Sequence, residues 1–237
     1  MKSYSSLRNL LIFALFSFFL FTVPLLSQVS PSILNWEKDI RALERLDSLE
    51  TDPSNAILFA GSSSIRLWDS IQSDMAPWPV IQRGYGGAKL SDFEYYARRI
   101  LYPHQPRAIA LFIANDITGS EYDKTPAEVA ALFKSILGII REKFPETPVF
   151  WIQITPTPSR WKSWDQIREA NRLIGEECTK DKACWLIQTE KNFLGPDGTP
   201  RKELFVGDQL HLSREGYKLW ASIIKETLED RLKKKIN

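Results

Sequence analysis

The sequence predicts an α/β fold in which helices cover both faces of a mainly parallel sheet. Short apolar runs alternate with longer amphipathic segments along most of the chain, and this alternation is typical of parallel strands that are connected by helices. The length of 237 residues, with 43% hydrophobic and 25% charged residues, fits one globular domain with a sizeable core.

The elements follow from the periodicity of the chain, in order. Residues 33–50 have apolar positions at helical spacing and predict an amphipathic helix packed on the domain. Apolar runs typical of buried strands come next, at residues 56–60, 79–82, 108–114, 148–155 and 184–188. Amphipathic segments between and after these runs predict helices over residues 90–101, 125–144, 163–180 and 213–234.

The N-terminal segment differs from the rest of the chain. Two basic residues precede an uncharged run of 18 residues, LLIFALFSFFLFTVPLLS, that ends at Ser27. This order is typical of an export signal. We therefore expect residues 1–27 to be a signal peptide, cleaved near Ser27 or Gln28, and residues 28–237 to form an exported domain, periplasmic or secreted. Because a run of 18 residues reaches the lower limit for a membrane span, a retained N-terminal anchor is the alternative.

The segments that directly follow the predicted strands are the place to look for a site, because ligands of such folds bind beyond the carboxyl ends of the strands. Hydroxyls, glycines, an amide and an Asp-His turn occur in these segments and in the one before the last helix: GSSSIR (61–66), RGYGGAK (83–89), NDITGS (115–120), PTPSRW (156–161) and GDQLHLS (207–213). They would converge on one edge of the sheet.

An Asp-x-x-His pair precedes the last helix in a chain that has only two histidines. Asp208 can reach one ring nitrogen of His211 across a tight turn and leave the other nitrogen free. A serine hydroxyl becomes a useful nucleophile when such a base takes its proton and a third group orients the base. The serines after Gly61 would place one hydroxyl at the start of a helix, with backbone N–H groups directed at a substrate oxygen.

Further donors for that oxygen are found after the next two strands. Gly86 and Gly87 allow the backbone to approach a ligand closely, and Asn115 can offer a side-chain N–H. Each such donor stabilises a transition state by roughly 2.7 to 4 kcal/mol. Each motif alone is more often a turn, a flexible loop or a cap than a catalytic group. Their order along the chain, with serine first and Asp-x-x-His last, favours a catalytic site.

This order of blocks, over roughly residues 56–230, resembles the SGNH hydrolases, also called the GDSL esterase and lipase family. The resemblance implies a flavodoxin-like, three-layer α/β/α fold around a five-stranded sheet. It also implies a serine esterase that hydrolyses carboxylic esters and needs no metal or organic cofactor. Small-molecule or glycan esters with short acyl groups are the expected substrates.

The resemblance assigns roles position by position. It implies that Ser63 is the nucleophile and that Asp208 and His211 complete the triad. The backbone N–H groups of Ser63 and Gly87 and the side chain of Asn115 would form the oxyanion hole.

Two positions depart from the family pattern. Ser62 replaces the usual aspartate, which leaves open whether Ser62, Ser63 or Ser64 attacks. Ile113 stands where the third block usually has glycine, and its side chain would narrow or reshape the acyl pocket.

Three other interpretations remain open at this point. An acyltransferase that acts on a glycan would use the same triad, and a catalytically silent binding module would keep the fold. An α/β-hydrolase also runs Ser, Asp, His, but its nucleophile elbow needs glycine two residues after the serine, where this chain has Ile65.

The remaining polar features predict few partners. Without residues 1–27 the chain has 29 basic and 29 acidic residues, a balance that argues against a nucleic-acid partner. A membrane would be contacted only through a retained N-terminal segment. Arg160 and Trp161 are weak candidates for substrate binding, by clamping a carboxylate or stacking on a sugar ring, with a packed loop as the alternative. His104 is interpreted as a loop residue without a carboxylate partner.

The two cysteines lie six positions apart. Cys178 and Cys184 can close a small loop in an exported protein, so a disulfide is an open possibility. No histidine or third cysteine is near them, and we therefore expect no metal site there.

Overall fold

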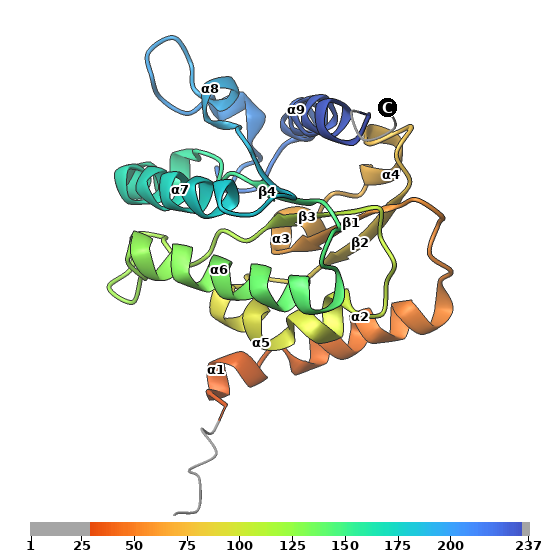
Figure 1. The fold of residues 1–237 in the computed structure, drawn as a ribbon. Helices are drawn as coiled ribbons and strands as arrows, with labels where there is room; N and C mark the ends of the chain where they lie inside the picture. Colours follow the sequence, from red (N-terminus) through yellow and green to blue (C-terminus); the bar gives the residue numbers. More distant parts are fainter. Residues whose placement is uncertain (1–28, 234–237) are drawn as a thin grey trace, which may run out of the picture.

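The computed structural model describes residues 29–233, which form a parallel sheet between two layers of helices (Figure 1). Within this range the sheet has five strands in the order β2-β1-β3-β4-β5, and every neighbouring pair is parallel. The strands are β1 (Ile57–Gly61), β2 (Val80–Gly84), β3 (Ala108–Phe112), β4 (Val149–Ile152) and β5 (Cys184–Ile187). The predicted three-layer α/β/α class is confirmed.

The helices of one layer contact one another in series, α2 with α5, α5 with α6, and α6 with α7. They are α2 (Glu37–Leu49), α5 (Leu90–Leu101), α6 (Pro126–Lys143) and α7 (Trp164–Thr179). The opposite layer holds α3 (Ser63–Arg66), α4 (Ile71–Asp74) and α9 (Arg214–Lys233), with α4 against α9. Short elements complete the description: α1 (Pro31–Leu34), η1 (Pro158–Ser163), α8 (Glu190–Phe193) and η2 (Lys202–Leu204).

The core explains why the strands read as continuous apolar runs. All residues of β1, β3 and β4 are buried, because helices cover both faces of the sheet. β4 ends at Ile152, earlier than the predicted end at residue 155, because Ile154 bonds to α7 and not to a neighbouring strand. The backbone N–H and C=O of Ile154 bond to the Asn171 side chain of α7, at 2.8 and 2.9 Å.

The predicted helix over residues 33–50 is two helices, α1 and α2, separated by a turn at Asn35 and Trp36. The turn directs the Trp36 ring into the domain. Its Nε1–H donates to Asp92 Oδ2 at 3.0 Å, and its ring packs edge-on against Tyr85 at 5.5 Å. The helical pattern could not show the break, because the reason for it is a contact with residues about 50 positions away.

A buried carboxylate fixes the start of α9. Asp74, at the end of α4, accepts hydrogen bonds from Trp68 Nε1 at 2.8 Å and from Ser70 Oγ at 2.7 Å. Its two oxygens also bind the guanidinium of Arg214, at 2.5 and 2.6 Å. Arg214 is the first residue of α9, so this cluster holds the loop that carries Asp208 and His211 against the sheet edge.

His104 is not the unpartnered loop residue that the sequence suggested. Its side chain is buried, its Nδ1 lies 2.8 Å from Asp52 Oδ2, and its Nε2 lies 3.4 Å from Asp47 Oδ1. Arg83 also binds Asp47, at 2.6 Å. These contacts fasten the end of α2 to the sheet, which is a structural role.

The predicted signal peptide, residues 1–27, lies outside the described residues. Among residues 29–233, no helix combines the length and the apolar character that crossing a bilayer requires.

Candidate active site

The serine turn begins where β1 ends. Gly61 has a φ of +143°, and a Cβ atom there would lie 2.0 Å from the carbonyl oxygen of Phe112 on β3, so only glycine fits. Ser62 is extended and buried, and its backbone N–H donates to the same carbonyl at 2.9 Å. Ser63 is the first residue of α3 and is half-buried. The turn thus presents the Ser63 hydroxyl at the edge of the sheet.

The Asp-His turn has the geometry that its spacing predicted. Asp208 Oδ1 accepts hydrogen bonds from the backbone N–H groups of Leu210 and His211, each at 2.9 Å. Gln209, which directly follows Asp208, has a φ of +57°. Asp208 Oδ2 lies 2.6 Å from His211 Nδ1. Partial burial raises the pKa of Asp208, but hydrogen bonds from the His211 side chain and from these two backbone groups lower it to about 2. The carboxylate is therefore ionised at neutral pH.

The structure brings the three predicted triad residues together. His211 Nε2 lies 2.9 Å from Ser63 Oγ, across 148 positions of sequence. An ionised carboxylate only accepts hydrogen bonds, so Nδ1 carries the ring proton and Nε2 is free to accept the hydroxyl proton. Of the three neighbouring serines it is Ser63 whose hydroxyl meets the imidazole, and the geometry therefore favours Ser63 over Ser62 and Ser64 as the nucleophile.

Asn115 lies beside this pair and is held from two sides. Its Nδ2 donates to the carbonyl of Ala88 at 2.9 Å, and its Oδ1 accepts from Arg160 Nη2 at 2.6 Å. Gly87 directly precedes Ala88, so Asn115 is tied to the glycine loop. The Ala88 carbonyl could not be found from sequence, because any residue type supplies that acceptor.

A small cavity of about 20 Å³ opens between these groups. Residues from four of the predicted segments line it, together with four residues at or just after the ends of β3 and β4. The lining residues are Ser62, Ser63, Ser64, Phe112, Ala114, Asn115, Ile154, Thr155, Thr157, Arg160, Leu210 and His211. Gly87 is not among them. Ile113, expected to shape the acyl pocket, is also absent from the lining and is fully buried in the core.

The two candidate substrate-binding residues of the PTPSRW segment have intramolecular partners. Arg160 donates through Nη1 to the Ala114 carbonyl and through Nη2 to Asn115. Trp161 stacks on Trp164, with ring centroids 5.9 Å apart and an interplanar angle of 18°. Both residues therefore belong to a packed loop, in which the Arg160 guanidinium contacts Asn115.

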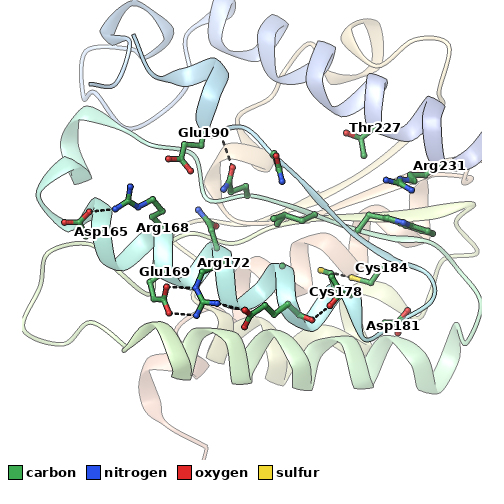
Figure 2. A pocket seen from close by; sticks show the side chains of 18 residues that line it. Asp165, Arg168, Glu169, Arg172, Cys178, Asp181, Cys184, Glu190, Thr227 and Arg231 are labelled. Atoms are coloured by element: carbon green, nitrogen blue, oxygen red, sulfur yellow. Dashed lines mark hydrogen bonds and ion pairs between the residues drawn. The ribbon is translucent and has the colours of Figure 1, made fainter. Parts of the chain in front are cut away.

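A larger cavity, of about 920 Å³, lies between α7, β5 and α9 (Figure 2), and its lining does not include Ser63. Its wall is charged, and Arg172 pairs there with Glu169 and Glu176. Cys178 and Cys184 line it, and in this structure both are free thiols with their sulfurs 3.0 Å apart. Residues 29–233 contain no cluster of His, Cys, Asp and Glu that could hold a metal ion.

Asp116, next to Asn115, gives the stability of the domain a testable pH dependence. Its Oδ2 accepts the Leu90 backbone N–H at 2.8 Å, and burial raises its pKa to about 6, against about 3.9 in an unfolded chain. The folded state therefore holds this proton more tightly, and stability should fall as pH rises from about 4 to about 6. In Asp116→Asn we expect this loss of stability to disappear, so the free energy of unfolding of the variant should rise relative to that of the wild type from about pH 4 to about pH 6.

Urea unfolding of both proteins between pH 4 and 7 measures this difference. Asp165→Asn, which removes a carboxylate with a side chain 90% exposed, should follow the wild-type curve. Parallel curves for wild type and Asp116→Asn would show that Asp116 does not bind a proton more tightly in the folded state.

Comparison with known proteins gives a consistent picture. The sequence model of the GDSL-like lipase/acylhydrolase family matches residues 51–219. No curated protein matches the sequence significantly.

Several solved structures share the fold at low sequence identity. A protein from Streptococcus pneumonia, described provisionally as a platelet activating factor, is 21% identical with a TM-score of 0.72, over 83% of this chain and 96% of that chain. A GDSL-like lipase from Bacteroides thetaiotaomicron is 15% identical with a TM-score of 0.65, over 81% and 98%. A catalytic mutant of an acetylxylan esterase from Geobacillus stearothermophilus is 12% identical with a TM-score of 0.60, over 74% and 94%.

Proposed function

Because this chain belongs to the GDSL-like lipase/acylhydrolase family and is a carboxylic ester hydrolase, we propose that it cleaves short-chain acyl esters with Ser63 as nucleophile. The observation that carries the proposal is the 2.9 Å contact between Ser63 Oγ and His211 Nε2, with Asp208 2.6 Å from the other ring nitrogen. Nucleophile, base and orienting carboxylate are thus connected in the order that acyl transfer requires.

The reaction follows from this geometry. As Ser63 Oγ attacks the ester carbonyl, its proton passes to His211 Nε2, and Asp208 stabilises the imidazolium that forms. The imidazolium then gives the proton to the leaving alcohol, and an acyl-enzyme remains on Ser63. A water molecule, deprotonated by His211, attacks the acyl-enzyme, and the acid is released as Ser63 regains its proton.

The negative oxygen of each tetrahedral intermediate needs donors. We assign this role to the backbone N–H groups of Ser63 and Gly87 and to Asn115 Nδ2. Among residues 29–233 neither backbone N–H has an intramolecular partner, and one of the two Nδ2 hydrogens of Asn115 is used by Ala88. Three donors therefore remain for a substrate oxygen.

The size of the cavity supports a small acyl group. About 20 Å³ beside Ser63 is little more than the space that one water molecule occupies, and a methyl group is of similar size. Acetyl esters are therefore the proposed substrates. The acetylxylan esterase with a similar fold is in keeping with this choice, and its catalytic mutants include an aspartate and a histidine three positions apart, the spacing of Asp208 and His211.

The alcohol side of the substrate meets fewer restrictions. The side chains of His211 and Asp208 are 25% and 48% exposed, so the leaving alcohol departs towards solvent. A sugar or another bulky alcohol can be accommodated there, which supports glycan or small-molecule esters as the substrate class.

Rates with p-nitrophenyl acetate, butyrate and octanoate test the acyl preference. We expect kcat/KM to fall at least about tenfold from acetate to butyrate, because two extra methylenes do not fit the cavity and steric misfits of this kind cost on the order of 1–3 kcal/mol. Leu210→Ala, which removes part of the cavity wall, should reduce this difference. A rate that rises with chain length would contradict the proposal of a short-acyl esterase.

The same assay separates hydrolysis from transfer. With acetylated sugar as donor and a second sugar as acceptor, we expect free acetate as the main product, whereas acetylated acceptor would identify a transferase.

We also propose that the domain is exported, on the basis of the apolar run that ends at Ser27. Sequencing of the mature N-terminus should then begin near Gln28, and an intact Met1 would contradict cleavage.

A further inference from the structure

The segment that follows β4 connects the two halves of the site. The backbone N–H of Ser159 donates to the carbonyl of Gln209 at 3.1 Å, within the loop that carries Asp208 and His211. The next residue, Arg160, turns its guanidinium towards the end of β3 and binds the Ala114 carbonyl and the Asn115 side chain. Residues 158–163 therefore fasten the loop of the catalytic base to the asparagine of the proposed oxyanion hole.

Arg160 determines which way the Asn115 amide points. A guanidinium can only donate hydrogen bonds and a carbonyl oxygen can only accept them. Asn115 Oδ1 must therefore face Arg160 and Nδ2 must face Ala88, as the distances of 2.6 and 2.9 Å indicate. Without the guanidinium, the amide would lose the donor that holds its oxygen, and a rotated amide would turn an acceptor towards the negative substrate oxygen.

The guanidinium is also a local positive charge. No carboxylate of residues 29–233 forms an ion pair with it, and only the more distant charges of Asp123 and Asp116 act on it. Burial lowers the pKa of Arg160, but an arginine keeps its proton in proteins. A charge that withdraws electrons from Asn115 Oδ1 makes the N–H on the other side of the amide a stronger donor, since hydrogen bonds in series polarise one another.

We propose that Arg160 is a positioning residue for transition-state stabilisation: it fixes and polarises the Asn115 amide without binding the substrate. This inference rests on the proposed function, because it concerns the oxyanion hole of that reaction. It differs from the substrate clamp that the sequence suggested, since the guanidinium would act through Asn115 on every ester and not only on anionic ones.

A double-mutant cycle tests the route through Asn115. Removing one oxyanion-hole donor lowers kcat by ~10²–10³, and we expect this for Asn115→Ala. Arg160→Met should lower kcat about 10–100-fold, because the donor remains but is no longer held or polarised. In the double variant, Arg160→Met should add less than about threefold to the effect of Asn115→Ala, since its target is gone. Multiplied effects would overturn the inference.

The split between kcat and KM separates positioning from substrate binding. For Arg160→Met we expect KM to stay within about twofold for both p-nitrophenyl acetate and an ester with a carboxylate on the alcohol. A rise in KM confined to the anionic ester would instead identify Arg160 as a substrate clamp and overturn the inference. Lys162→Met, an exposed change in the same segment, is the matched control and should leave both constants unchanged.

A conservative variant covers the case in which Arg160→Met does not fold. Arg160→Lys keeps the charge and one donor, so its kcat should lie between those of wild type and Arg160→Met. If the Arg160→Met variant does not fold, the kcat of Arg160→Lys should still be clearly below that of wild type. In that case the double-mutant cycle with Asn115→Ala is measured with Arg160→Lys, and the same comparison tests whether Arg160 acts through Asn115. A wild-type kcat in folded Arg160→Lys and Arg160→Met would overturn the inference, whereas full activity of Ser63→Ala would overturn the proposed function itself.

Discussion

Replacement of Ser63 by alanine is expected to lower kcat for acetyl ester hydrolysis by about 10⁴-fold or more, as for the nucleophiles of other serine hydrolases. Ser63 Oγ is the hydroxyl that lies 2.9 Å from His211 Nε2, the proposed base, and in the proposed reaction no acyl-enzyme can form without it. Alanine removes one oxygen from a half-buried position, so the fold should persist. Initial rates with p-nitrophenyl acetate, alongside circular dichroism of the variant, measure this effect.

The adjacent serines are the matched controls. Ser64→Ala should retain kcat within a few-fold, because the hydrogen bond to His211 comes from Ser63. Ser62→Ala changes a fully buried turn residue and should lower stability more than it lowers kcat of the folded protein. Activity that survives in Ser63→Ala but is lost in either control would move the nucleophile by one position and refute the assignment.

Replacement of His211 by glutamine should be nearly as severe, with kcat lower by about 10⁴-fold or more. Glutamine can bond to both neighbours but cannot take a proton from Ser63. His104→Gln is the contrasting variant, because His104 contacts Asp52 and Asp47 and has a structural role outside the proposed active site. It should lower the free energy of unfolding while the folded fraction keeps its kcat. The reverse pattern would exclude His211 as the base.

The pH profile provides a further check on this assignment. The pKa of Asp208 is about 2, so this carboxylate stays ionised above about pH 4 and its orienting role is constant there. A loss of kcat/KM on the acidic side above pH 4 should therefore come from a group other than Asp208. In Asp116→Asn, which lacks the neighbouring carboxyl with a pKa of about 6, a two-proton loss in that range would show that Asp208 titrates as well.

Much of the fold was predictable because its signals are local. Strands buried on both faces are continuous apolar runs, and the Thr125 and Glu128 side chains form the capping box that starts α6, one residue after its predicted beginning. The turn after Asn35 was not predictable, since it exists to bring Trp36 to Asp92. α4 was missed, and α3 was expected only as a helix start after Gly61, because four residues are too few to show a helical period.

The site shows the same division. Ser63, Asn115, Asp208 and His211 could be found from their order along the chain, since a parallel sheet brings the ends of its strands to one edge. The choice among three consecutive serines depends on backbone direction at Gly61, which the sequence does not show. The contact of Arg160 with Asn115 joins residues 45 positions apart, and no local pattern in PTPSRW indicates that its arginine faces inward.

The most direct test of the central claim is covalent labelling of the nucleophile. A fluorophosphonate reacts with a serine hydroxyl that a neighbouring base activates, and peptide mapping by mass spectrometry identifies the modified residue. If Ser63 and His211 share a proton as proposed, the wild type should carry one adduct, on Ser63, and His211→Gln should carry almost none. An adduct on another residue, or equal labelling of Ser63 in the folded wild type and His211→Gln proteins, would contradict the account.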